Sequence, residues 1–193
     1  MKEAYRHLTA AAEAKETAIG RLAEIIAILR VECPWDRVQT HESLRAGMLE
    51  EAYEVVEAID NKDLANLREE LGDVLLQVVF HAHIEEERGG FDLTDVINEE
   101  CEKMIRRHPH VFLEESENNH AKSIDKVLEK WENIKVEEKH EKSCASRLER
   151  VPKALPALVR AFKVQKKAAD VGFDWDDVSG AFDKVAEEYA EFM

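Results

Sequence analysis

The stretch LEEAYEVVEAIDNKDLANLREELGDVLLQ, residues 49–77, decides how we interpret this chain. A polar break at residues 60–63 separates two segments with helical apolar patterns, which predicts a helical hairpin. Carboxylates are placed symmetrically on its two arms. Glu54 and Glu70 each lie eight residues from Lys62, and Glu51 and Asp73 each lie eleven residues from it. If the arms are antiparallel helices, the four carboxylates meet at two adjacent levels.

Such a gathering of negative charge calls for a positive partner. The segment LGDVLLQVVF, residues 71–80, is apolar nearly all round, so Asp73 is expected to be buried. An unpaired buried carboxylate is costly or becomes protonated. Oxygen ligands alone suit a hard divalent cation, most often Mg²⁺. The alternative is that Glu51 and Glu54 form salt bridges with Arg68 or Lys62 on a solvated helix face.

The rest of the chain predicts an all-α protein. It has 193 residues, of which 45% are apolar, 36% are charged and only seven are glycine, a composition typical of helical domains. Apolar spacing and capping residues predict five helices: residues 3–31, from Thr40 or Ser43 to about Asp60, residues 64–88, 94–107, and about 124–141. We expect residues 114–119 to form a solvated loop and residues 140–156 to form a linker.

Charge and cysteine usage limit the possible partners and compartments. The net charge of −15 argues against binding nucleic acid or an anionic membrane, since both depend on Lys and Arg. Three cysteines at unrelated spacings indicate reduced thiols rather than a disulfide framework. The N-terminal residues lack an apolar signal region, and no window is long and apolar enough to span a membrane. We therefore expect a cytoplasmic protein.

The beginning of the sequence is echoed near its end. The pattern ILRVECPWD…MLEEAYE returns as KKAADVGFDWD…VAEEYAE. The repeat is inexact, because the spacing from Trp35 to Glu51 is 16 residues and the spacing from Trp175 to Glu188 is 13. We interpret the chain as one complete module followed by the opening of a second, which ends before any counterpart of the second hairpin arm.

The acidic pattern resembles that of a known family. Glu50-Glu51-x-x-Glu54 followed by Glu70-x-x-Asp73 is similar to the EExxE…ExxD signature of the MazG-like, all-α nucleoside triphosphate pyrophosphohydrolases. Other stretches also resemble the family: CPWDRVQTHESL (residues 33–44), REELGDVLLQVVFHA (68–82), KMIRRHPHVF (103–112), KWENIK (130–135) and ALPALVRAFKVQKKAADVGFDWDDV (154–178). The resemblance therefore extends over essentially the whole chain.

The resemblance implies a fold, an activity and a domain organisation. The fold would be a MazG-like four-helix-bundle unit that forms a homodimer. The activity would be hydrolysis of NTP or dNTP to the monophosphate and pyrophosphate, dependent on Mg²⁺, with Mn²⁺ as a possible substitute. Residues 1–115 would form the catalytic domain, residues 116–150 a charged helix and linker, and residues 151–193 the start of a second repeat.

The resemblance also implies roles for individual residues. The metal ligands would be Glu51, Glu54, Glu70 and Asp73. Glu50 belongs to the same motif, and we expect either Glu50 or Glu54 to act as the general base on a bound water. Lys103 and Arg107 match the basic pair that meets the triphosphate, and Trp131 matches a nucleotide-contacting tryptophan.

Other interpretations of these residues stay open. Lys103 and Arg107 could be an ordinary basic last turn that favours the helix dipole, and Trp131 could be a packing residue. The whole chain could be a catalytically silent nucleotide-binding or dimerisation module of a two-repeat protein. A di-iron bundle is disfavoured, because no Glu-x-x-His motif lies on the apolar helices. No residue indicates a base or sugar preference. Four further histidines are too scattered for a zinc site: His81, His83, His108 and His110.

Overall fold

The computed structural model of the chain describes residues 2–112, 123–138 and 144–193. Every regular element within these ranges is a helix, which confirms the all-α prediction. The chain divides into two compact units, the first ending at Arg106 and the second beginning at Arg107. None of the helices in the described ranges is long and apolar enough to cross a membrane.

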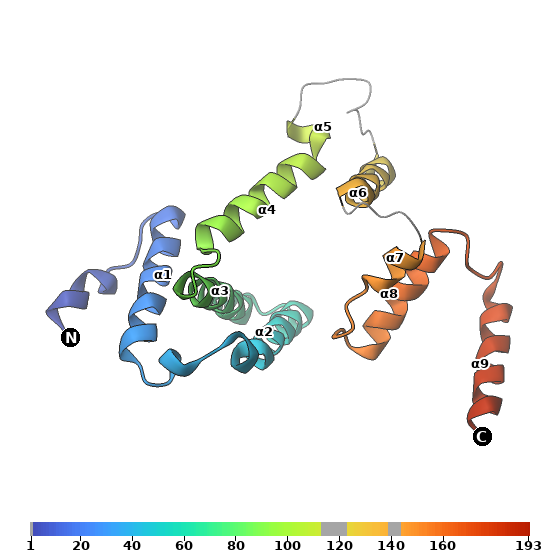
Figure 1. Ribbon diagram of the computed structural model, residues 1–193, viewed down its shortest axis with the longest axis horizontal. Coiled ribbons are helices and arrows are strands. Elements are labelled where there is room, and N and C mark those ends of the chain that lie inside the picture. Colours follow the sequence, from blue (N-terminus) through green and yellow to red (C-terminus); the bar gives the residue numbers. More distant parts are fainter. Residues whose placement is uncertain (1, 113–122, 139–143) are drawn as a thin grey trace. The chain divides into compact units, whose positions relative to one another are not determined.

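The first unit contains four α-helices, shown in Figure 1, and two short 3₁₀ helices. Their bounds are η1 Glu3–Thr9, α1 Lys15–Glu32, η2 Asp36–Val38, α2 His41–Asn61, α3 Leu64–Glu87 and α4 Leu93–Arg107. The predicted ends of the second, third and fourth helices are confirmed to within one residue.

The prediction of one helix over residues 3–31 was wrong. The chain leaves the helical path at residues 10–14, although alanine-rich sequence favours helix. Polar contacts of η1 with α1 explain the break: the Tyr5 hydroxyl bonds Glu32, and Arg21 Nε donates to the Leu8 carbonyl at 2.8 Å. These contacts fold η1 back along α1, so the intervening residues must reverse direction and cannot remain helical.

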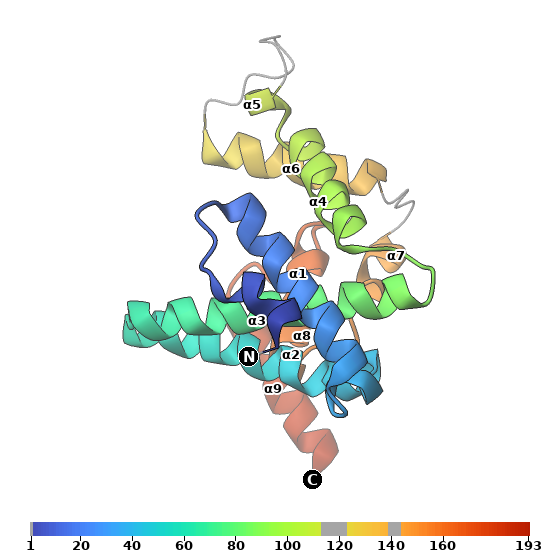
Figure 2. The ribbon, with the colours of Figure 1, turned by 90° about the vertical axis from the view of Figure 1, so that its left-hand side faces the viewer.

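The hairpin of α2 and α3 has defined ends. At the start of α2, Thr40 accepts a hydrogen bond from the Ser43 amide in a reciprocal capping box. Lys62 ends the helix in the left-handed conformation, with φ 57° and ψ 30°. Asp63 then caps α3 by accepting from the amides of Ala65 and Asn66 at 3.0 and 3.1 Å. With two residues between them, α2 and α3 run side by side in opposite directions (Figure 2).

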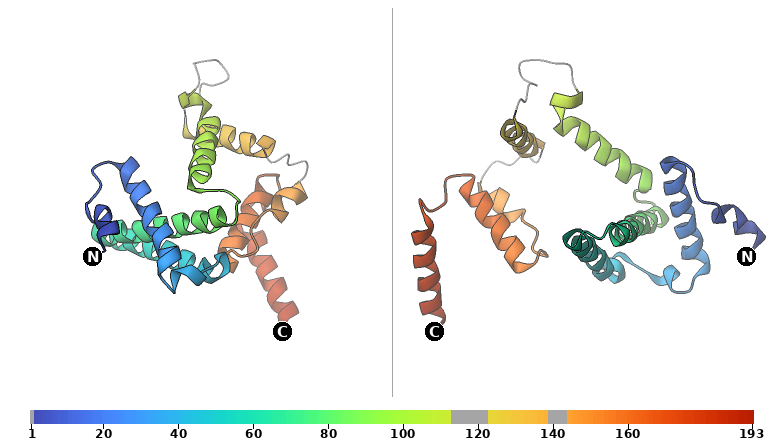
Figure 3. Two further views of the ribbon diagram at one scale, coloured as in Figure 1. Left: turned by 60° about the vertical axis from the view of Figure 1, so that its left-hand side comes forward. Right: turned by 180° about the vertical axis from the view of Figure 1, so that it is seen from behind.

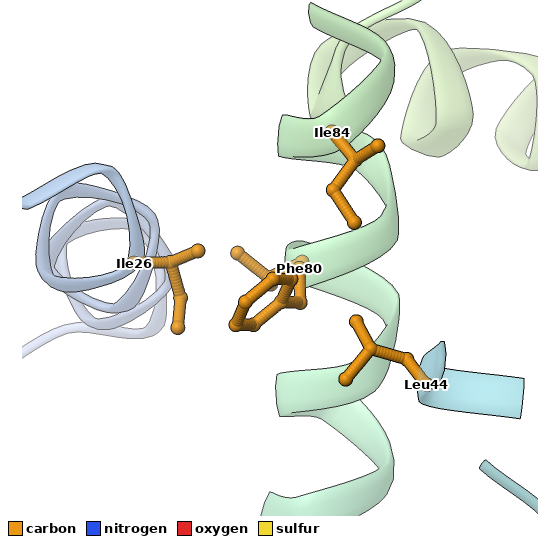
Figure 4. Close-up of a cluster of buried hydrophobic side chains, with 5 residues drawn as sticks. Ile26, Leu44, Phe80 and Ile84 are labelled. Carbon is orange, nitrogen blue, oxygen red and sulfur yellow. The ribbon is translucent and has the colours of Figure 1, made fainter. Parts of the chain in front are cut away.

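The core of the first unit lies where α1, α2 and α3 meet. Ile26 of α1 faces Phe80 and Ile84 of α3, and Leu44 of α2 approaches the same cluster (Figure 4). Val79 completes the buried set. Leu93 at the start of α4 packs against this cluster, but α4 itself has no buried residue. The α1–α3 core therefore fixes the hairpin, and α4 extends from it.

A buried arginine joins the loop before α2 to the end of α3. The Arg30 guanidinium donates to the carbonyls of Asp36 and Gln39 at 2.6 and 3.0 Å. It also forms a two-pronged ion pair with Glu87, at 2.9 and 2.5 Å. Only 8% of its side chain is exposed. Glu87 thereby neutralises the charge of Arg30, and the guanidinium satisfies two loop carbonyls.

The described part of the second unit also consists of helices joined by loops (Figure 3). Their bounds are α5 Pro109–Phe112, α6 Ile124–Glu138, α7 Cys144–Glu149, α8 Ala157–Ala169 and α9 Val178–Phe192. The expected linker at 140–156 thus contains a short helix, α7, and the expected loop at 114–119 lies outside the described residues. Several aromatic side chains of α8, α9 and the loop between them are largely exposed: Phe162, Phe173, Phe182, Tyr189 and Phe192.

We expect replacement of Arg30 by alanine to destabilise the fold by about 2–3 kcal/mol, because two loop carbonyls and Glu87 lose their donor. Urea unfolding measures the change. The control is Arg37→Ala in the neighbouring η2 turn, where the side chain is exposed and should change stability by less than about 0.5 kcal/mol. Equal losses for the two variants would contradict a clamping role for Arg30.

Candidate metal centre

The hairpin brings three carboxylates together. One ligand oxygen from each of Glu51, Glu70 and Asp73 lies within 4.8 Å of the others. Glu54 is more exposed but lies within hydrogen-bonding reach of both Glu51 and Glu70. Glu50 is exposed beside them and adds to the negative potential at Glu51. The mirrored spacing around the turn therefore does place these acidic side chains in one cluster.

Burial and mutual repulsion raise the pKa values of two carboxyl groups in the cluster. The pKa of Glu51 is raised, first by burial and then by the charges of Asp73 and Glu54. The pKa of Glu70 is raised by burial and then by Glu54. Glu70 is the most buried of the set, at 9% exposure, whereas Asp73, for which we expected burial, is half-buried. Crowded carboxylates whose charged forms are disfavoured are suited to a cation.

The salt-bridge alternative receives no support. Within the described ranges, none of the ion pairs involves Glu51, Glu54, Glu70 or Asp73, and neither Arg68 nor Lys62 reaches them. The donor set is all oxygen and lacks a neutralising side chain. It therefore fits a hard divalent ion such as Mg²⁺.

The next level of the hairpin is also polar. Gly47 of α2 lies against Gln77 of α3, and a Cβ at residue 47 would stand only 3.0 Å from Gln77 Nε2. The side-chain oxygen of Gln77, Oε1, is buried and has no hydrogen-bond partner among the residues described. Glu70, Asp73 and Gln77 follow one another at spacings of three and four residues, so they share one face of α3. A polar seam thus continues from the carboxylates along the hairpin.

The basic and aromatic residues have defined local partners. Lys103 forms an ion pair with Glu100 one turn earlier in α4. Arg107 donates to Glu138 of α6 through Nε at 3.1 Å and Nη2 at 2.6 Å. The ring of Trp131 lies 6.2 Å from that of His108. Lys103 belongs to the first unit, and Arg107 and Trp131 belong to the second.

The chain matches known proteins over this region and beyond. Residues 39–112, which include the whole hairpin, match the model of the MazG nucleotide pyrophosphohydrolase domain. The fold is similar to that in a crystal structure of a mazG-related protein from Thermotoga maritima. The match covers 97% of that chain and 60% of this one, with 34% sequence identity and a TM-score of 0.51. This chain belongs to the MazG family.

Longer MazG relatives match most of the chain. A nucleoside triphosphate pyrophosphohydrolase of Escherichia coli K12 is 46% identical over 178 residues, covering 91% of this chain and 66% of that protein. A nucleoside triphosphate pyrophosphohydrolase/pyrophosphatase MazG of Thermotoga maritima is 49% identical over 159 residues, covering 82% of this chain and 59% of that protein. The chain thus spans slightly less than two thirds of these relatives' length.

Two features of the hairpin escaped the sequence analysis. Gly47 was not singled out, and its pairing with Gln77 was not anticipated. His41 was overlooked, although it contacts His81. A signal was available: 47 and 77 each lie fifteen residues from Lys62, and 41 and 81 depart from the same symmetry by two residues. Counting outward from the turn could therefore have found the Gly47–Gln77 pairing and placed His41 near His81.

The raised pKa values of Glu51 and Glu70 have a consequence for stability. The folded protein keeps protons that the unfolded chain has already released, so the metal-free protein loses stability as pH rises from the ordinary glutamate range through the raised pKa values. We expect Asp73→Asn, which removes one repulsive charge, to leave the melting temperature of metal-free protein at neutral pH unchanged or higher.

Magnesium should separate this variant from the parent. At a Mg²⁺ concentration 100-fold above the dissociation constant, the parent should gain about 2.7 kcal/mol, while Asp73→Asn gains little. Asp60→Asn, at the exposed end of α2, is the control and should respond to Mg²⁺ like the parent. Melting curves with and without Mg²⁺ measure both effects. If millimolar Mg²⁺ leaves the melting temperature of the parent unchanged, both with and without nucleotide, that result would argue against the metal site.

Proposed function

We propose that this chain hydrolyses nucleoside triphosphates to the monophosphate and pyrophosphate, with Mg²⁺ held by Glu51, Glu54, Glu70 and Asp73. The observation that carries the proposal is the unneutralised carboxylate cluster in the hairpin. It is supported by the pyrophosphohydrolase names of relatives 46% and 49% identical to this chain. The proposed site lies entirely within the stretch that matches the family model.

The acidic residues divide between ion binding and proton transfer. A bound Mg²⁺ would supply charge neutralisation for the triphosphate and lower the pKa of a coordinated water, and Mn²⁺ could serve instead. Glu70 and Asp73, the less exposed pair from α3, suit ion binding. Glu54 and Glu50 are exposed, so either can reach solvent and accept a proton from water. We therefore assign the general base to Glu54 or Glu50.

Recognition of the substrate is assigned to the basic and aromatic residues. Lys103 and Arg107 are separated by one turn of α4, so they lie on the same helix face and can contact successive phosphates. The ion pair of Arg107 with Glu138 fixes the orientation of the guanidinium. Trp131 offers an aromatic surface beside His108 for the nucleoside. These roles rest on the family pattern and on the local contacts described above.

We further propose that the chain works in the cytoplasm and that residues 151–193 open a second repeat after the charged segment 116–150. The thiols of Cys33 and Cys101 are free, which suits a reducing compartment. The match to the Escherichia coli relative covers 91% of this chain, which is longer than one family domain. Residues 1–115 would then be the catalytic module.

The activity prediction uses the same substitution as the metal test. Asp73→Asn keeps the side-chain size but removes a charge, so we expect Mg²⁺-dependent turnover of a nucleoside triphosphate to fall more than about 100-fold. Phosphate release in the presence of added inorganic pyrophosphatase measures it. Asp60→Asn is the control and should retain parent activity.

The same assay tests the rival function. A chain that binds nucleotide and Mg²⁺ but releases no pyrophosphate would be a catalytically silent binding module. A chain that shows neither binding nor turnover would contradict both assignments. Parent activity that persists in full with Asp73→Asn would place the chemistry elsewhere.

We also propose that the hairpin forms a homodimer. Both helices expose apolar rows on the sides opposite their carboxylates, with 41–78% of each residue exposed: Leu49, Tyr53 and Val56 on α2, and Leu64, Leu71 and Leu75 on α3. Soluble monomers rarely leave large contiguous apolar patches in water. A two-fold related second hairpin would cover both rows and complete a four-helix arrangement.

We expect light scattering at micromolar concentration to give a mass near twice the 22.1 kDa of one chain. Tyr53→Glu should shift this mass to the monomer, because it places a charge in the centre of the apolar row. Val31→Glu is the matched control, since Val31 of α1 is 69% exposed and lies outside the row. A monomeric parent would contradict the proposed dimer.

A further inference from the structure

A second polar cluster lies in the hairpin, at the end away from the turn. His41 opens α2, and its Nδ1 is 2.7 Å from Nδ1 of His81 in α3. The two rings are nearly parallel, with centroids 5.0 Å apart and planes inclined by 11°. On its other side, His41 Nε2 lies 2.6 Å from Glu85 Oε1, which also accepts from Arg88 Nη1 at 2.9 Å. The histidine pair thus joins the start of α2 to the last turns of α3.

These distances limit where the protons can be. An ionised carboxylate only accepts, so the short contact with Glu85 requires His41 to carry its proton on Nε2. The contact between the two Nδ1 atoms is a hydrogen bond, and such a bond holds one proton. That proton belongs either to a neutral His81 or to a His41 imidazolium paired with Glu85. Both states satisfy every bond in the cluster.

A further proton cannot be accommodated. If both rings were imidazolium, two N–H groups would point at each other across 2.7 Å, and two positive charges would lie side by side. We propose that the His41–His81 pair is a pH-sensitive latch, which holds the open end of the hairpin together with one shared proton and releases it when a second proton binds.

The surrounding charges favour this behaviour. The pKa of His81 is lowered, first by burial and then by His41. The pKa of Glu85 is lowered, first by its hydrogen bond with His41 and then by that with Arg88, so it stays an acceptor.

The other charged groups near this end contact the histidine pair less directly than Glu85 does. On α2, the pKa of Glu42 is lowered by hydrogen bonds with its own backbone and Thr40, with smaller contributions from Arg88 and His41. From α1 and η2, the guanidinium of Arg30 lies between Glu87 and the Asp36 loop. On α3, His83 contacts Glu86 and Glu87. Glu85 is thus the carboxylate that directly contacts the histidine pair, and Glu42 acts on it through a smaller charge interaction.

The direction of the pH effect follows. Because the folded-state pKa of His81 is depressed, the unfolded chain binds a proton that the folded protein excludes. Stability at this end is therefore present above the ordinary histidine range and is lost as pH falls below it. The effect is local, since the carboxylate cluster lies three turns away along α2 and loses repulsion, rather than gaining it, on acidification.

Amide hydrogen exchange, corrected for the intrinsic pH dependence, tests the latch on the whole chain. Between about pH 7.5 and about pH 5.5, we expect protection of the amides of residues 44–47 to fall at least about fivefold, while that of Ala58 near the turn is unchanged. His81→Asn keeps a hydrogen-bonding side chain but cannot bind the second proton, so this fall should disappear. His7→Asn, in η1 and paired with Glu24, is the control and should behave like the parent.

Ring-nitrogen NMR of the parent provides a test that needs no variant. The latch requires two separate protonation steps, with the second coinciding with the loss of protection at residues 44–47. Two rings that titrate together near the ordinary histidine pKa of about 6.5, with constant protection, would overturn the proposal. An equal fall of protection in His81→Asn and in the parent would overturn it as well.

Discussion

The register of the hairpin depends on one tight turn. Lys62 adopts a left-handed conformation, and its amide and that of Asp63 return hydrogen bonds to the last carbonyls of α2. Asp63 then caps α3 at once. With only two residues between the helices, their relative position along the axis has no freedom. Every pairing further along the hairpin, from Glu51 with Asp73 to Gly47 with Gln77, follows from this geometry.

Much of this arrangement could be predicted from the sequence. The hairpin, the start of α2 at Thr40 (one of the two starts expected) and the meeting of the carboxylates all depend on local patterns and on counting from the turn. The predictions failed where contacts between residues far apart in the sequence determine the structure. Residues 10–14 are alanine-rich, yet they reverse the chain because Tyr5 and its neighbours bond side chains far along α1. Helical periodicity also predicts which side of a helix a residue faces, but not how deeply that residue is buried. Asp73 was therefore expected to be more buried than it is.

The carboxylate cluster shows how a site can work against the fold that carries it. Burial and repulsion disfavour the charged forms of Glu51 and Glu70, so the metal-free hairpin is strained electrostatically at neutral pH. The core of Ile26, Phe80 and Ile84 and the Arg30 clamp compensate from the neighbouring helices. The contacts of this core and of Arg30 lie outside the carboxylate cluster.

The apolar rows and the carboxylates occupy opposite sides of the same two helices. Positions such as Leu49 and Tyr53 alternate in the sequence with positions such as Glu51 and Glu54, but they never share a surface. Natural selection can therefore act on the two sets separately. A substitution in the apolar rows therefore need not alter the carboxylate cluster, and a substitution in the cluster need not alter the rows. One hairpin thus presents two surfaces that can change independently of each other.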